Sequence, residues 1–65
     1  MLVYINGEQQ ETQCKNLLEL VQSLELEGKR FAVEVNEMII SKSRLGETPI
    51  CEADKIEIIH AVGGG

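Results

Sequence analysis

The sequence has little of the material from which enzyme active sites are usually built. It contains no tryptophan, one histidine, two cysteines and only 65 residues in all. A chain of this length forms one small core, which buries about 60% of the surface that the unfolded chain exposes. A catalytic cleft usually needs a concave volume of several hundred Å³, so we expect a binding or carrier module and not an enzyme.

Basic residues and long apolar runs are also scarce. Eleven Asp and Glu against six Lys and Arg give a net charge of −5. This balance argues against a nucleic-acid partner, whose phosphates need clustered basic residues, and favours a basic protein surface as partner; the alternative is that the charge only keeps the protein soluble. No apolar run approaches the roughly 20 residues of a membrane-spanning helix, so we expect no membrane partner and a cytoplasmic location.

The two cysteines, Cys14 and Cys51, do not form a recognisable motif. They are far apart, no C-x-x-C occurs, and His60 is the only histidine, which does not make a zinc site. Because no signal peptide is evident, we expect two reduced, structural thiols. A disulfide or a dithiol redox site is the weaker alternative.

The first thirteen residues predict a β-hairpin. Residues 1–5 are apolar and β-prone, and Asn6-Gly7 follows at once, a pair that readily supplies the positive φ angles of a type I′ turn. Residues 8–13 form the polar return strand, which suits a sheet edge. Within the first strand, Val3 and Ile5 should face the core.

A helix is predicted to follow. Asn16 has the character of an N-cap, and Glu19 three residues later completes a pattern similar to a capping box. Gly28 is a suitable C-cap. The apolar residues recur at helical spacing and should form one buried stripe: Leu17, Leu20, Val21 and Leu24.

The second half of the chain predicts mainly short strands. The expected elements are a strand at 31–35, a turn at 36–37, a strand from 38 to 40, an irregular polar stretch at 41–46, a turn at 52–54, and a final strand from 55 to about 62. One helix packed on one mixed sheet of four to five strands buries both apolar faces. We therefore expect an α+β domain over residues 1–62, with its first and last strands adjacent near the sheet centre.

Three glycines, Gly63, Gly64 and Gly65, follow the last predicted strand. Glycine loses much backbone freedom on ordering, so a run of it predicts a flexible tail over residues 63–65. Extended, this tail reaches roughly 10 Å, which would carry the Gly65 carboxylate into a cleft of another protein. A frayed end or a cloning remnant is the alternative.

Alternation along the last strand predicts which side chains face outward. Ile56 and Ile58 should contact the helix, which leaves Ile59 on the open face of the sheet. Ile59 could equally be a singly exposed apolar residue without function. His60 should turn inward and pack, since the sequence places no acid or nucleophile beside it. The candidate partner contacts are Ile59, Ala61, Val62 and Gly63, with Leu2 or Tyr4 nearby.

The order of elements and the Gly-Gly terminus resemble the β-grasp, or ubiquitin-like, fold. The stretches Phe31-Ala-Val-Glu-Val-Asn36 and Lys55-Ile-Glu-Ile-Ile-His-Ala-Val-Gly-Gly-Gly65 resemble more closely the ThiS family, sulfur carrier proteins of thiamin thiazole synthesis. Two turns depart from the family pattern. Asn36-Glu37 stands where Asn-Gly is typical, and Glu52-Ala53-Asp54 stands where Asp-Gly-Asp is common.

The resemblance implies a carrier chemistry at the C-terminus. A ThiF-like adenylyltransferase would use ATP and Mg²⁺ to convert the Gly65 carboxylate to an acyl-adenylate. A persulfide donor would replace AMP and leave a thiocarboxylate, whose sulfur a ThiG-like thiazole synthase would take up. The carrier itself would be a monomeric co-substrate that binds no cofactor, with Gly65 as acyl carrier, Gly64 keeping access open and Gly63 extending the reach.

Three alternatives stay open at this point. A molybdopterin-synthase small subunit and a ubiquitin-like modifier use the same activated Gly-Gly end, although molybdopterin subunits are usually somewhat longer. A non-catalytic interaction domain with an inert tail would use none of this chemistry.

The glycine tail generates a direct test at Gly64. Because the activating site must enclose the terminus closely to align the carboxylate with the α-phosphate, Gly64→Phe should block activation and leave the fold intact. The measurement is the rate of sulfur loading, with circular dichroism as the control for folding. Loading of Gly64→Phe at the wild-type rate would refute the narrow channel.

Overall fold

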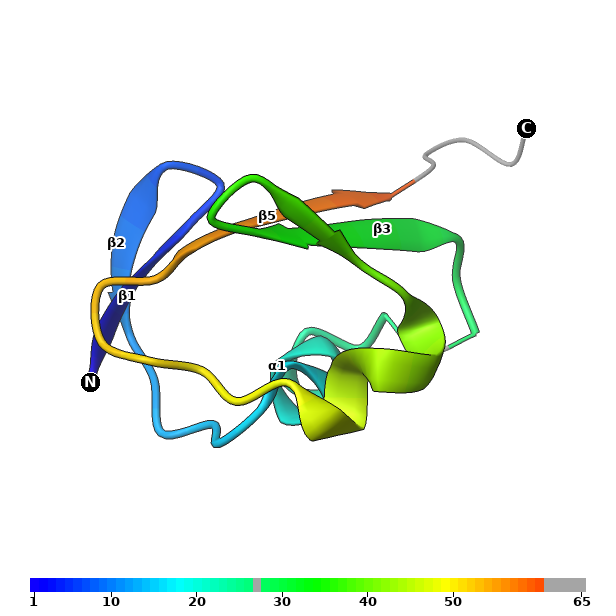
Figure 1. The fold of residues 1–65 in the computed structure, drawn as a ribbon, viewed down its shortest axis with the longest axis horizontal. Coiled ribbons are helices and arrows are strands. Elements are labelled where there is room, and N and C mark those ends of the chain that lie inside the picture. The colour runs from blue at the N-terminus through cyan, green and yellow to red at the C-terminus, as the bar shows by residue number, and fades with distance from the viewer. Residues whose placement is uncertain (27, 61–65) are drawn as a thin grey trace.

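The computed structural model describes residues 1–26 and 28–60. The predicted end of the last strand at Val62, and the predicted tail at 63–65, lie outside these residues. The described chain forms a five-stranded mixed sheet in the order β2-β1-β5-β3-β4. A helix, α1 (Leu17–Ser23), and a 3₁₀ helix, η1 (Lys42–Glu47), cover one face of the sheet (Figure 1). The predicted α+β architecture is confirmed.

The N-terminal hairpin joins β1 (Leu2–Ile5) to β2 (Glu8–Glu11). It forms because Asn6 and Gly7 both take left-handed φ angles, 51° and 83°, as a type I′ turn requires. Val3 and Ile5 are buried, as alternation predicts, and β2 lies at the sheet edge.

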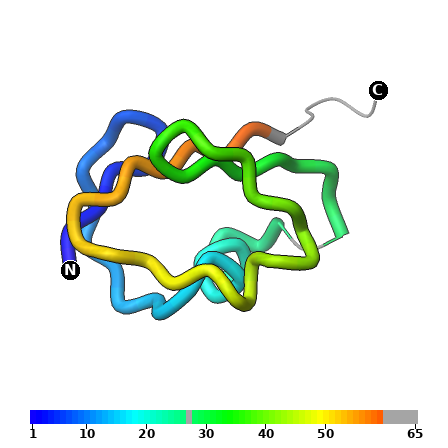
Figure 2. Tube along the Cα trace, viewed as in Figure 1, coloured from blue at the N-terminus to red at the C-terminus, as the bar shows by residue number. Residues whose placement is uncertain are grey.

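The last strand is the central one. β5 (Lys55–His60) pairs in parallel with β1 and antiparallel with β3 (Phe31–Val35), which pairs in turn with β4 (Met38–Ile40). The predicted adjacency of the first and last strands is therefore confirmed. Figure 2 shows how the segment between η1 and β5 leaves the helical layer and returns to the sheet to make this arrangement possible.

The core lies between the sheet and the helical layer. It consists of eleven buried apolar residues: Val3, Ile5, Leu17, Leu20, Val21, Leu26, Val33, Leu45, Ile50, Ile56 and Ile58. Cys14 packs against this core, whereas Cys51 is exposed, and both are free thiols. The expected structural role thus fits Cys14 and not Cys51.

The start of α1 follows its prediction closely. The Asn16 side-chain oxygen accepts a hydrogen bond from the Glu19 amide at 2.9 Å. The Glu19 carboxylate accepts a hydrogen bond from the Lys15 amide at 2.8 Å. In a capping box the donor would be the amide of the N-cap residue, Asn16, so the donor here lies one residue earlier. Two of the amides at this end of the helix are therefore satisfied by local side chains.

The end of α1 differs from its prediction. The helix stops at Ser23, because Glu25 takes a left-handed φ of 59°, and the expected C-cap, Gly28, lies in a later turn. The Leu26 amide donates to the Val21 carbonyl at 3.2 Å, and the Glu25 amide donates to the Gln22 carbonyl at 3.0 Å, which is a Schellman motif.

This early turn changes which leucine enters the core. Leu24 was expected in the buried stripe, but it is 43% exposed, and Leu26 is buried in its place. The reason is geometric: the left-handed residue reverses the chain, so the residue after it packs back onto the last turn of the helix. Helical periodicity cannot detect this, because the periodic segment ends before Leu24.

The stretch 41–46 was expected to be irregular, but it forms most of η1. The single buried side chain in this short helix is Leu45, which is 2% exposed. One apolar residue in a polar segment shows no period, and for this reason the sequence pattern missed the helix.

Both turns that depart from the family pattern contain left-handed residues without glycine. Asn36 and Glu37 have φ angles of 50° and 73°, and Ala53 has 69°. The Ala53 conformation is held by its amide, which donates to the Leu2 carbonyl at 2.7 Å. The Asn36 side chain links the two turns, because its amide group donates to the Asp54 carboxylate at 3.1 Å.

These left-handed positions predict stabilising substitutions. Glu25→Gly and Ala53→Gly should each raise the free energy of unfolding by about 1 kcal/mol, because glycine adopts positive φ without the steric cost that other residues pay. Urea unfolding measures the change. Ala32→Gly, in the middle of β3, is the control and should destabilise the protein; destabilisation by the first two substitutions would contradict the prediction.

Candidate functional site

The predicted reactive end follows directly after β5, the strand that is paired on both sides. β3 supports β5 from its second residue to its last, with Val35 opposite Ile56 and Phe31 opposite His60. β1 pairs with only the first two residues, through Tyr4 opposite Lys55 and Ile5 opposite Ile56. The candidate residues Ala61, Val62, Gly63, Gly64 and Gly65 lie outside the described residues, and so does the predicted orientation of the His60 side chain.

Asn6 extends the support that β1 gives to β5. Its amide donates to the Ile56 carbonyl at 2.9 Å, and its side-chain oxygen accepts from the Ile58 amide at 2.8 Å. The backbone of β5 is thus held from both sides as far as Ile58. Sequence reasoning missed this role, because the Asn6-Gly7 pair is already fully explained by the turn that it forms.

The open face of the sheet carries the predicted contact residue. Ile56 and Ile58 are buried, and Ile59, near the end of β5, is 59% exposed. Ala32 of β3 lies directly opposite Ile59. The predicted orientation of these three isoleucines is confirmed, so Ile59 is accessible to a partner.

Leu2 and Tyr4 are exposed as expected, but they do not lie next to Ile59. Tyr4 is opposite Lys55, at the start of β5. Ile59 lies four positions after Lys55, roughly 13 Å along a strand. Leu2 is farther away still. A more exposed apolar residue, Ile39 of β4, lies on this face opposite Glu34, and the sequence analysis did not single it out.

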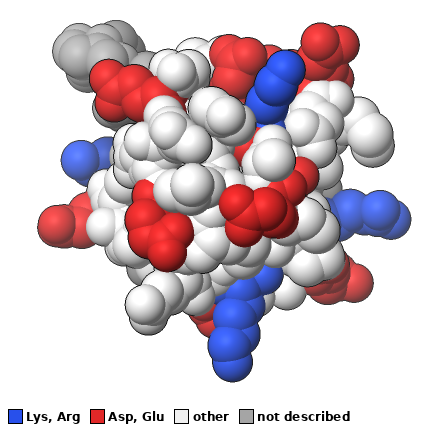
Figure 3. Space-filling model, turned by 90° about the vertical axis from the view of Figure 1, so that its left-hand side faces the viewer, with Lys and Arg blue, Asp and Glu red and all other residues white. Residues whose placement is uncertain are grey.

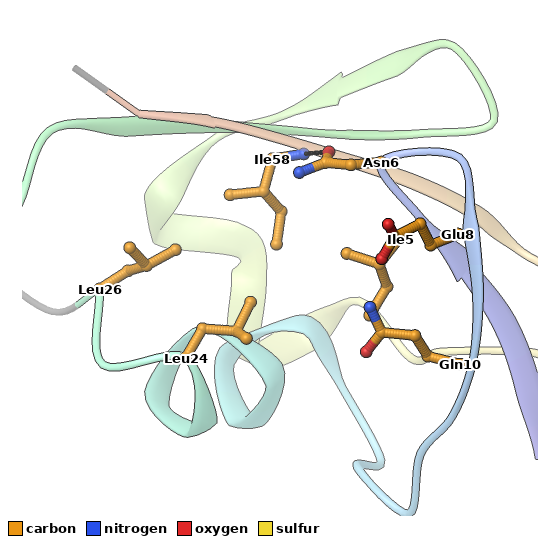
Figure 4. A pocket seen from close by; sticks show the side chains of 7 residues that line it. All are labelled: Ile5, Asn6, Glu8, Gln10, Leu24, Leu26 and Ile58. Carbon is orange, nitrogen blue, oxygen red and sulfur yellow. Dashed lines mark hydrogen bonds between the residues drawn. The ribbon is translucent and has the colours of Figure 1, made fainter. Parts of the chain in front are cut away.

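A hollow of about 450 Å³ lies on the other side of the sheet, between the hairpin and the end of α1. Figure 4 shows Ile5 and Ile58 pointing down from the sheet toward Leu24 and Leu26, with polar side chains of the hairpin at one side. The complete lining is Ile5, Asn6, Glu8, Gln10, Leu24, Leu26 and Ile58. Glu8 is the only ionisable side chain of this lining, which makes the hollow unsuited to acid–base or nucleophilic catalysis.

Two further kinds of site were sought in the described part of the chain. No group of three or more His, Cys, Asp and Glu within residues 1–26 and 28–60 is placed to hold a metal ion. No helix of the described chain is long and apolar enough to cross a membrane.

Comparison with known proteins gives a consistent result. A family model described as the ThiS family matches residues 2–65. The sulfur carrier protein ThiS of Bacillus subtilis is 49% identical over 47 residues, which cover 72% of this chain and 71% of that protein. The crystal structure of the thiamine biosynthesis protein (ThiS) from Geobacter metallireducens superposes with a TM-score of 0.82 over both whole chains at 23% identity, which supports the fold.

Another relative is much longer. The thiazole synthase of Magnetococcus marinus is 33% identical over 66 residues, which cover all of this chain but only 20% of that protein. A region similar to this whole chain therefore occurs within a protein five times its length.

The Asn6 contact predicts how firmly the end of β5 is held. Asn6→Gly keeps the turn but removes the acceptor for the Ile58 amide, which should lower the free energy of unfolding by about 1 kcal/mol and speed hydrogen exchange at Ile58. Asn6→Asp retains an acceptor and serves as the matched control. NMR-detected exchange at Ile58 that stays as slow in Asn6→Gly as in the wild type would show that the contact is not needed.

Proposed function

The chain belongs to the ThiS family, and we propose that it is a sulfur carrier protein for thiazole formation in thiamin biosynthesis. The observation that carries this proposal is the position of β5, the central strand, which is paired on both sides and leads directly into the sequence Ala-Val-Gly-Gly-Gly. The name of the Bacillus subtilis relative supports the same role.

The proposed reaction takes place at the carboxylate of Gly65. A carboxylate is a poor acyl donor until it carries a leaving group, and covalent activation divides this difficult step into two easier ones. A ThiF-like adenylyltransferase binds ATP with Mg²⁺; the carboxylate oxygen attacks the α-phosphorus of the ATP, and pyrophosphate leaves. The terminal sulfur of a persulfide donor then attacks the acyl carbon, and AMP leaves. A thiol reduces the resulting sulfur–sulfur bond and frees the thiocarboxylate.

The fold supports a division of labour between this chain and its partners. The hollow beside α1 has Glu8 as the single ionisable side chain of its lining and lies on the opposite side of the sheet from Ile59. We therefore assign catalysis to the partner enzymes, while this chain serves as a co-substrate that presents its terminus. Gly64 and Gly63 bear no side chains, so they can follow a narrow channel and adopt φ angles that other residues avoid.

The proposed acceptor of the sulfur is a ThiG-like thiazole synthase. The support is the relative in Magnetococcus marinus, which bears the name thiazole synthase and contains a region 33% identical to this whole chain. Joining two proteins in one chain raises their effective concentration, which benefits partners that must meet at every turnover.

Mass spectrometry of the C-terminal peptide tests the proposal. Cleavage after Lys55 releases residues 56–65, which contain neither Met nor Cys, so no side-chain oxidation or persulfide imitates the exchange of oxygen for sulfur. The protein is incubated with the adenylyltransferase of the same organism, ATP, Mg²⁺ and a sulfur source. We expect an ATP-dependent exchange of one oxygen for sulfur.

The control for this experiment is a double variant, Cys14→Ser with Cys51→Ser, which should load sulfur at the wild-type rate because the terminus and not a thiol is the carrier. An unchanged peptide, with the adenylyltransferase shown to be active on another carrier, would contradict the proposed function. Loss of loading in the double variant would instead assign the sulfur to a cysteine.

A further inference from the structure

One face of the sheet has no described element packed over it. α1 and η1 both cover the opposite face, and Figure 1 shows the sheet as the outer layer on this side. Ile59 and Ile39 are 59% and 77% exposed on this face. An isolated exposed isoleucine needs no explanation, so these two residues alone do not indicate a partner. The charged residues near them on the same face give more information about what could bind.

Glu34 of β3 and Glu57 of β5 lie directly opposite each other in the antiparallel ladder. Their neighbours Val33 and Ile58 are buried, so both glutamates point to the open face. The Cβ atoms of such a pair are about 4.5–5.5 Å apart, and like charges in this position destabilise a sheet. The free protein therefore carries an unfavourable charge pair near the middle of its open face.

This charge pair is not neutralised within the described part of the chain. Within the described residues, an ion pair joins the Met1 amino group to Glu11 at 3.1 Å. Neither Glu34 nor Glu57 takes part in an ion pair there. Lys55 lies on the same face, two residues before Glu57, without approaching a carboxylate closely enough to count as an ion pair. The acidic pair is thus open to a cation from outside.

A hollow of about 260 Å³ surrounds the acidic pair, lined by Glu34, Asn36, Glu37, Lys55 and Glu57. The Asn36 side chain is fixed, because it donates to Asp54 and accepts from the Lys55 amide at 3.1 Å. Three carboxylates beside one amine leave a net negative hollow. In Figure 3, acidic side chains lie along the upper rim with a basic side chain among them, and others lie lower on the same face.

Charge complementarity decides what this face can bind. A second copy would bring the same acidic hollow against itself, and nucleic-acid phosphates would also be repelled. An arginine fits best, because its planar guanidinium binds two carboxylates with charge-assisted hydrogen bonds. Ile59 and Ile39 flank the hollow and can exclude water around such a contact.

We propose that the open face binds a basic surface of thiazole synthase, with an arginine of the enzyme between Glu34 and Glu57. This inference rests on the proposed function and names the chemistry of its partner surface. The contact lies on the strand that leads to Gly65 and next to Ile59, so binding here directs the chain end toward the same enzyme. The charge pair that strains the free carrier becomes favourable in the complex.

The test compares Glu34→Gln and Glu57→Gln with the wild-type full chain. Calorimetry measures the dissociation constant for the thiazole synthase of the same organism, at low and at raised salt. We expect each substitution to raise the dissociation constant about tenfold and to weaken its salt dependence. The matched control is Glu47→Gln, an exposed residue of η1 in the other layer, which removes the same charge and should bind as the wild type does.

A second readout separates this role from a structural one. Removing one member of a like-charge pair should leave the free energy of unfolding unchanged or raise it, so weaker binding by Glu34→Gln and Glu57→Gln cannot come from a loss of folding. Binding of both variants with the wild-type dissociation constant would overturn the proposal. So would weaker adenylation with unchanged synthase binding, which would assign the face to the adenylyltransferase.

The sulfur-loading assay distinguishes failure of the assigned binding face from failure of the proposed function. If the wild-type carrier acquires sulfur and binds the synthase, but both variants bind equally well, the carrier role stands and the assigned face is wrong. If the wild-type carrier does not bind the synthase at all, the proposed acceptor and the assigned face both fail.

Discussion

The pairing of β5 with a strand on each side is the constraint on which the rest of the structure depends. A parallel neighbour, β1, cannot be connected to β5 by a short turn, and the chain between them passes twice through the helical layer. The connection from β2 to β3 contains α1 and the connection from β4 to β5 contains η1, and both cover one face of the sheet. Because each residue of β5 then alternates between a covered and an uncovered face, Ile56 and Ile58 complete the core and Glu57 and Ile59 are presented outward.

The same strand therefore serves stability and recognition with alternate residues. Its inner residues are almost completely buried, at 1% and 7% exposure, and anchor the strand. Its outer residues include Glu57, which faces Glu34 at a cost to the free protein. The proposed function, in which one enzyme after another binds the carrier, benefits from this separation, because the outer residues can suit a partner without disturbing the core.

The turns show how tertiary contacts maintain local conformations that the residues themselves disfavour. Glu25, Glu37 and Ala53 all take positive φ angles, which cost L-residues roughly 1–2 kcal/mol each. The first is held by a Schellman motif around Leu26 and the third by the hydrogen bond from Ala53 to Leu2. Packing and backbone hydrogen bonds thus offset the local strain, and glycine is not required at these positions.

Alternation, turn residues and capping residues were sufficient to predict most of the fold. They predicted the hairpin at Asn6-Gly7, the start of α1 at Asn16 and the outward orientation of Ile59, because each depends on neighbouring residues or on a two-residue period. The adjacency of the first and last strands was predicted from their apolar composition, which is typical of strands at the centre of a sheet. The predicted role of Gly65 came from family resemblance, and residues 61–65 lie outside the described structure.

Other features depended on contacts between distant residues, which no local pattern records. Leu26 replaced Leu24 in the core because a left-handed turn at Glu25 reversed the chain. Asn6 reached the Ile58 amide 52 residues away. Glu34 met Glu57 only because the antiparallel register of β3 and β5 places them opposite each other. Pairing register and chain reversal bring these groups together, and both are properties of the folded chain.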